Sequence, residues 1–114
     1  SDGVQDIEWQ IMTIQNRRAL FFNQYPSFLL NSVTKTVSGH TGCNAIYGRY
    51  TYDFAQQKLD FHVMAGHDSC PKALAQEADL MDLIQRVERF QFDGANLYLL
   101  DAKGQRLIQA QPKR

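Results

Sequence analysis

Residues 44–54 read NAIYGRYTYDF, and this stretch predicts a long β-strand. Side chains of a strand alternate between its two faces, which separates the following two sets. Ile46, Gly48, Tyr50 and Tyr52 share one face, and Tyr47, Arg49 and Thr51 share the other. Gly48 inside a strand indicates a bulge or a close backbone approach. Residues 53–57 supply turn residues, and Lys58–Val63 then returns as an antiparallel neighbour.

Short apolar runs with strand spacing continue on both sides of this pair. They occur around residues 7–11, 19–22, 28–30, 33–37, 90–92, 97–100 and 107–110. Between them, Pro71–Arg89 changes to helical spacing, with apolar residues at Leu74, Ala78, Met81, Ile84 and Val87. Proline suits the first turn of a helix, where its missing N–H costs nothing. The chain is therefore expected to hold about eight short strands and one helix over about 71–89.

The fold class predicted from these elements is α+β, in one domain over residues 1–114. Short connections favour antiparallel pairing, and a curved, barrel-like sheet with the helix packed across it buries both apolar sets. Polar composition predicts flexible tails over residues 1–6 and 111–114. Lysine plus arginine balances aspartate plus glutamate, so the basic excess typical of nucleic-acid binders is absent, and nucleic acid is not expected as a partner.

The two cysteines stand in matched settings, each three residues after a histidine. Three interpretations follow from the residues. Cys43 and Cys70 could form a disulfide; His40, Cys43, His67 and Cys70 could hold zinc in a tetrahedral site; or Cys43 could be a nucleophile. A nucleophile needs a base within hydrogen-bond reach, and the sequence places none of His40, His62 or His67 there; His62 is expected at the surface.

The order of several short motifs resembles the META domain family, which includes heat-shock protein HslJ-like proteins of the bacterial envelope. The resemblance runs from about Trp9 to Leu107. It rests on Trp9, Gly39, Gly42, Cys43, Asn44, Gly48, Tyr50, Leu59, Phe61, Cys70, Glu77, Leu80, Ile84, Val87, Phe90, Gly94, Leu97, Leu99, Gly104 and Leu107. The chain departs from the family pattern before the second cysteine, where Gly66 and Asp68 replace a threonine and a methionine.

The resemblance implies a barrel-like α+β domain and an exported protein, often lipid-anchored in the bacterial envelope, with no agreed catalytic activity. In an exported domain of this size two cysteines usually pair, so a Cys43–Cys70 disulfide is expected and no metal is. The bridge would close a loop of about 28 residues, which the chain-entropy model values at about 3.6 kcal/mol. Its expected role is to hold the 39–43 loop against the start of the helix.

The function expected from these observations is a non-enzymatic, disulfide-stabilised binding or accessory module of the bacterial envelope, related to stress response. Its expected location is the periplasm or, as a lipoprotein, the outer membrane; the only membrane association expected is a lipid anchor removed from this chain. The alternative is a carrier of a lipid or other small apolar ligand in a barrel cavity. The partner is then an unknown envelope protein or that apolar ligand, and no cofactor is expected. Tyr47, Tyr50 and Tyr52 could line a ligand groove, although cross-strand packing is the favoured role.

Overall fold

The computed structural model describes residues 3–113 as one curved sheet with one helix. The strands are β1 (Glu8–Ile14), β2 (Arg17–Arg18), β3 (Ser27–Asn31), β4 (Thr36–His40), β5 (Ala45–Asp53), β6 (Lys58–Ala65), β7 (Arg89–Asp93), β8 (Asn96–Leu100) and β9 (Arg106–Pro112). The helix α1 (Leu74–Arg86) follows β6. The predicted α+β class is confirmed. The ninth strand is the two-residue β2, and the apolar run at residues 19–22 is a loop rather than a strand.

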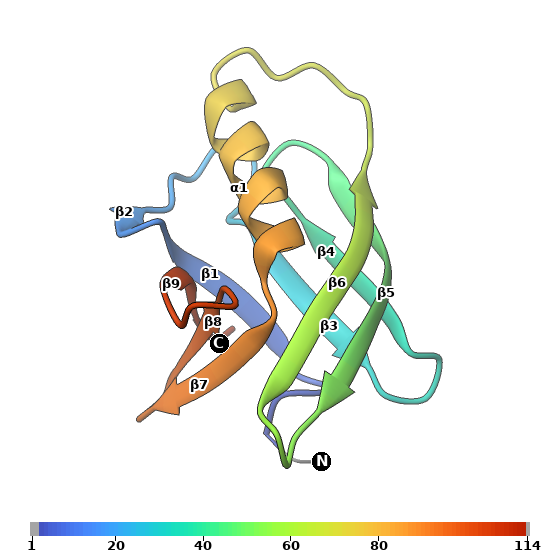
Figure 1. Ribbon diagram of the computed structural model, residues 1–114. Coiled ribbons are helices and arrows are strands. Elements are labelled where there is room, and N and C mark those ends of the chain that lie inside the picture. The colour runs from blue at the N-terminus through green and yellow to red at the C-terminus, as the bar shows by residue number, and fades with distance from the viewer. Residues whose placement is uncertain (1–2, 114) are drawn as a thin grey trace.

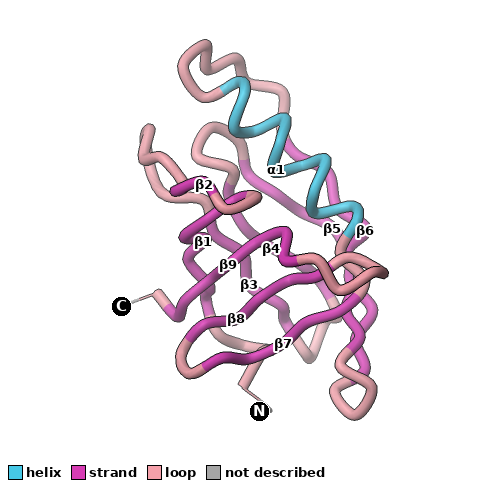
Figure 2. The backbone as a smooth tube through the Cα atoms, turned by 60° about the vertical axis from the view of Figure 1, so that its left-hand side comes forward, coloured by secondary structure: helices cyan, strands magenta, loops and turns pink. Residues whose placement is uncertain are grey.

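The strands close into a ring. Their order is β2-β1-β3-β4-β5-β6-β7-β8-β9, all neighbours are antiparallel, and β9 pairs again with β1 (Figures 1 and 2). Eight strands therefore form the barrel, and β2 extends β1 outside it. An eight-stranded ring is narrow enough for side chains to fill its interior.

The core consists of the inward-facing residues of this ring and one side of the helix. Its largest fully buried side chains are Trp9, Phe28, Phe90, Ile11, Leu30, Ile46, Leu59, Leu80, Ile84, Leu97, Leu99 and Ile108. Phe28 and Phe61 meet edge to face, with ring centroids 5.8 Å apart, so aromatic rings from β3 and β6 contact each other inside the barrel.

The ring is weakest between β6 and β7, and the helix covers that place. β5 and β6 pair over eight consecutive positions, whereas β6 and β7 pair only at Lys58 and Arg89. The chain leaves β6 at one end of the barrel, and α1 returns along it, with Leu80, Leu83 and Ile84 buried (Figure 1). The helix thus replaces the strand pairing that the upper half of β6 lacks.

Gly48 fulfils one of its two predicted roles. The β5–β6 register is continuous through Gly48 and Val63, so there is no bulge at this position. A Cβ atom at Gly48 would overlap the carbonyl oxygen of His62. The glycine is therefore needed for the close approach of the two backbones.

The helix is shorter than predicted at both ends. Pro71 and Lys72 form a turn closed by the Ala73 N–H, which donates to the Cys70 carbonyl over 2.8 Å. At the other end Val87 is extended, so the helix stops before it. The predicted apolar stripe is also shifted, because Leu74 and Ala78 are exposed and the buried residues begin at Leu80.

The tails predicted over residues 1–6 and 111–114 are wrong for the part that the structure describes. Val4 is fully buried, and its carbonyl accepts a hydrogen bond from Trp9 Nε1 over 2.8 Å. β9 continues through Gln111 to Pro112, which pairs with Trp9. Polar composition misled here, because the backbone of a closing strand is satisfied by its neighbours whatever its side chains are. Residues 1, 2 and 114 lie outside the described part.

Candidate functional site

Cys43 and Cys70 form the predicted disulfide, with a Cα–Cα distance of 6.0 Å. Cys43 lies in the loop between β4 and β5, and Cys70 lies in the loop between β6 and α1. The bridge therefore ties the helix-side loop to the rim of the sheet at the end of the barrel where α1 begins (Figure 1). The disulfide thus connects the 39–43 loop to the segment before the helix, as the sequence predicted.

A buried polar turn supports the first cysteine. Thr41 and Asn44 are both buried, and the Thr41 N–H donates to the Asn44 carbonyl over 2.8 Å. In return, Thr41 Oγ1 accepts from the backbone N–H groups of Cys43 and Asn44, at 3.0 and 2.9 Å. The threonine hydroxyl thus satisfies the donors of a tight turn that would otherwise be left without partners.

Glu77 connects this turn to the helix. Its Oε2 accepts from Thr41 Oγ1 over 2.5 Å and from Asn44 Nδ2 over 2.9 Å. In the sequence, Glu77 is recognisable only as a helix residue of the family pattern. Thr41 and Asn44, close to Cys43, were the only sign in the sequence that a carboxylate of the helix could bind there. Their partner Glu77 is more than thirty residues away.

Asn44 also holds the second cysteine loop. Its Nδ2 donates to the Asp68 carbonyl over 3.0 Å, and its Oδ1 accepts from the Asp68 N–H over 2.8 Å. A Cβ atom at Gly66 would lie 2.9 Å from this Oδ1. A side chain at position 66 would therefore crowd Asn44, which explains the glycine at one of the two positions that depart from the family pattern. Asp68 takes part through its backbone.

His40 borders the cluster and is partly buried. Its Nδ1 accepts a hydrogen bond from the Gly42 N–H over 2.9 Å. Burial lowers the pKa of His40 below its usual value, and the negative charge of Glu77 opposes part of this shift. The neutral imidazole is the form that accepts the Gly42 hydrogen bond, so the turn and the lowered pKa favour the same protonation state.

The zinc alternative is wrong for this arrangement. Both cysteine sulfurs are bonded to each other, and a sulfur in a disulfide is no thiolate ligand. Among residues 3–113, no group of three or more histidine, cysteine, aspartate and glutamate side chains is arranged to hold a metal ion. His67 is exposed in its loop, while His40 faces Gly42. Oxidation also removes Cys43 as a nucleophile.

The three tyrosines do not line one groove. Tyr50 is 5% exposed and Tyr52 is partly buried, and Tyr52 stacks on Phe90 with centroids 5.4 Å apart. Tyr47 is 50% exposed on the outer face, opposite Met64 of β6. The predicted division of β5 into two faces is thus confirmed, and the packing role favoured for these residues describes Tyr50 and Tyr52.

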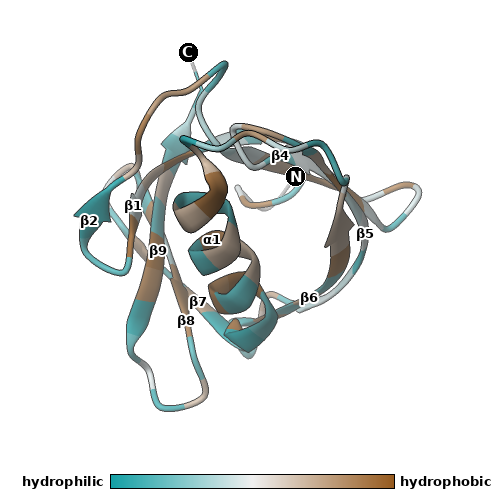
Figure 3. Cartoon of the chain, turned by 90° about the horizontal axis from the view of Figure 1, so that it is seen from above, coloured by the Kyte–Doolittle hydropathy of each residue, from teal (hydrophilic) through white to brown (hydrophobic). Residues whose placement is uncertain are grey.

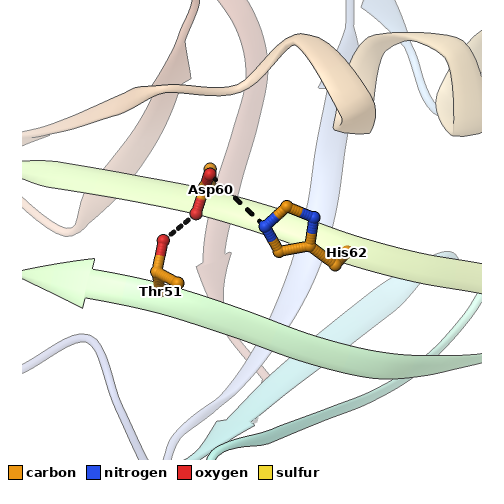
Figure 4. A network of polar contacts seen from close by, with 3 residues as sticks. All are labelled: Thr51, Asp60 and His62. Atoms are coloured by element: carbon orange, nitrogen blue, oxygen red, sulfur yellow. Dashed lines mark hydrogen bonds and ion pairs between the residues drawn. The ribbon is translucent and has the colours of Figure 1, made fainter.

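The outer face of β5 and β6 carries a small polar contact. Thr51 donates to the carboxylate of Asp60, and His62 Nε2 lies 3.5 Å from the other oxygen of the same carboxylate (Figure 4). His62 is exposed, as expected from the sequence. Exposed pairs of this kind add little to stability, because both partners are well solvated without each other.

The sequence matches the META domain family model over residues 2–114, and the chain therefore belongs to the META domain family. No curated protein matches the chain. Among the residues described, there is no helix with the length and apolar character needed to cross a bilayer. The family and the disulfide are consistent with an exported bacterial protein.

Three solved structures share the fold. One is an NMR structure of a protein from Burkholderia xenovorans, with 16% identity and a TM-score of 0.70 over 96% of this chain and 83% of that chain. A second NMR structure has 13% identity and a TM-score of 0.71, covering 96% and 91%. A crystal structure of a DUF4847 family protein from Bacteroides vulgatus has 14% identity and a TM-score of 0.63, covering 75% and 57%. At these identities the likeness concerns the fold alone.

Proposed function

We propose that this chain is a non-enzymatic, exported binding or accessory module of the bacterial cell envelope, with a role related to stress. The observation that carries the proposal is the disulfide joined to a buried polar cluster. Disulfides persist in oxidising compartments, and this one fastens two loops that Asn44 also joins. A domain that depends on this disulfide fits the oxidising periplasm, either free or attached to the outer membrane as a lipoprotein.

The contacts of the polar side chains support a structural role for the cluster. Glu77 accepts from Thr41 and Asn44, and His40 accepts from the Gly42 backbone. These acceptors are already engaged by other groups of the protein, whereas catalytic acids and bases must reach a substrate. The rigid frame then presents its surface to a partner.

The carrier alternative receives less support from the barrel interior. Phe28, Phe61 and Tyr50 fill positions that an apolar ligand would need. The largest grooves described lie on the outside, including one of about 500 Å³ beside Tyr52, Lys58 and Arg89. Native mass spectrometry separates the two functions, because a carrier isolated from its own cells is expected to retain a lipid-sized mass, and a binding module is not.

The compartment is tested by fractionating cells that express the gene with its natural upstream sequence. A maleimide polymer is added to each fraction before and after reduction, and the gel shift counts free thiols. The protein is expected in the envelope fraction, with no shift before reduction and two thiols after it. Cys70→Ser is the matched control, because it leaves Cys43 free to react without reduction.

Recovery of the protein in the cytoplasm with two free thiols would refute the proposal. Turnover of a substrate in a broad hydrolase screen, lost in Glu77→Gln but not in Asp79→Asn, would replace the non-enzymatic role with a catalytic one.

A further inference from the structure

An exposed apolar surface lies beside the start of the helix. We name it the apolar tip; it consists of the exposed Leu20, Phe21, Tyr25 and Leu74 and of the partly buried Phe22. Phe21 is 57% exposed and Leu74 is 63% exposed. Figure 3 shows that the segment after β2 is coloured apolar and passes outside the helix. Large apolar side chains gathered in this way indicate an interaction surface.

Two loops are held together to form the tip. The Leu20 N–H donates to Gln76 Oε1 over 2.8 Å, and Gln76 Nε2 donates back to the Leu20 carbonyl over 3.1 Å. The Cys70 disulfide fixes the segment that leads into Leu74. Between the loops runs a groove of about 380 Å³, lined by Phe22, Asn23 and residues 70–73. The tip is thus pre-formed, with both halves fastened to the frame.

Three cations lie next to the tip along the chain or in its groove. Arg17 and Arg18 precede it in β2, Lys72 lies in its groove, and all three are exposed. None of the three forms an ion pair with another of residues 3–113. Residues 9–52 contain no aspartate or glutamate at all, although the whole chain is neutral. The carboxylates nearest to the tip along the chain are Asp68, Glu77 and Asp79, and Glu77 is engaged with Thr41 and Asn44.

We propose that the apolar tip docks onto the surface of an anionic phospholipid bilayer, with Arg17, Arg18 and Lys72 at the level of the phosphates. Aromatic side chains with cations around them are the combination that binds membrane interfaces. The size of the tip favours this occupant over a protein, because five side chains fall well below the roughly 20–30 residues a side of a standard protein interface. The inference rests on the proposed envelope role and names its binding surface.

The test is co-sedimentation of the oxidised chain with phosphatidylcholine vesicles, with and without phosphatidylglycerol. Binding is expected only with phosphatidylglycerol and is expected to weaken as salt is added. Phe21→Ser with Leu74→Ser should weaken it about tenfold or more. Replacing Arg17, Arg18 and Lys72 by Gln should weaken it about fivefold per cation.

Two control variants carry the same chemistry elsewhere on the molecule. Val33→Ser removes an apolar side chain that is 89% exposed in the turn between β3 and β4, away from the tip. Lys35→Gln, Arg49→Gln and Lys103→Gln remove three exposed cations outside the tip. Both controls should bind vesicles like the parent chain, and thermal unfolding should show that every variant is folded, since the altered side chains are largely exposed.

Failure to sediment with phosphatidylglycerol vesicles would overturn the inference, and so would equal binding by the tip variants and their controls. A dimer in light scattering that Phe21→Ser dissociates would reassign the tip to contact between two copies. Cell fractionation tests the envelope role separately. If the protein is found in the envelope but does not bind vesicles, the bilayer inference is refuted and the envelope role stands.

Discussion

The two ends of the barrel are stabilised by different kinds of interaction. At the end where α1 begins, a disulfide and a buried polar cluster join the loops. At the other end, the N-terminal segment folds over the sheet: Val4 is buried, and Trp9 packs against Phe92 with ring centroids 6.3 Å apart (Figure 1). We call them the clamped end and the packed end.

The difference follows from what each end contains. The packed end is closed by the β1–β9 pairing, which has one register shift between Ile11 and Thr13, and by apolar burial. The clamped end consists of two irregular loops, whose backbone groups have few strand partners. There, side-chain hydrogen bonds and a covalent bridge supply the order that secondary structure supplies elsewhere.

The largest expected loss of stability comes from a substitution at the packed end. Trp9→Ala should lower the free energy of unfolding by about 4 kcal/mol, because it leaves a large cavity and removes the donor to the Val4 carbonyl. Urea unfolding followed by circular dichroism measures the loss. Val33→Ala is the control and should change little, and a Trp9→Ala loss below about 1 kcal/mol would show that the packed end contributes little to stability.

The second largest expected loss of stability comes from removing the disulfide at the clamped end. Cys43→Ser with Cys70→Ser should cost about 3.6 kcal/mol, because the unfolded chain regains the entropy of an open loop. Urea unfolding of this variant should match that of the reduced parent protein. Stability equal to that of the oxidised parent would mean that the polar cluster alone holds the clamped end.

A third change separates the polar cluster from the covalent bridge. Glu77→Ala should cost about 2 kcal/mol, since it removes one acceptor shared by the buried Thr41 and Asn44. Asp79→Ala, on an exposed helix position, is the matched control. If both variants unfold at the same urea concentration, the cluster adds nothing to the bridge.

The smallest expected effect concerns pH at the clamped end. Burial lowers the pKa of His40 in the folded protein, so below pH 6.5 the unfolded chain binds the proton more readily. This contribution to stability is therefore complete above pH 6.5 and is lost as the pH falls below it. Thermal midpoints should fall less between pH 7 and pH 5.5 in His40→Gln than in the parent. A pH dependence of His40→Gln identical to that of the parent would exclude this linkage.

The packed regions were predictable because their signal is local. Alternation in residues 44–54 placed Tyr50 inward and Tyr47 outward, and helical spacing located α1 to within a few residues. Composition failed at the tails, where Val4 is buried in the core and Gln111 pairs with Gln10 of a strand far away in sequence.

The clamped end was predictable only in its covalent part. The two cysteines indicate a bridge, but nothing near Glu77 in the sequence identifies Thr41 or Asn44 as its partners. Glu77 lies among ordinary helix polar residues, and only the closed fold brings it to the turn. Hydrogen bonds between residues more than thirty positions apart leave no periodic pattern.

The pairing of β9 with β1 also has a consequence for the order of events during synthesis. Trp9 leaves the ribosome long before its partner Pro112. Until β9 emerges, β1 and β8 each present an unpaired edge, and the ring cannot close. Folding dominated by such distant contacts is slow. A nascent chain of this kind stays open until β9 arrives, and only then can the ring become a barrel.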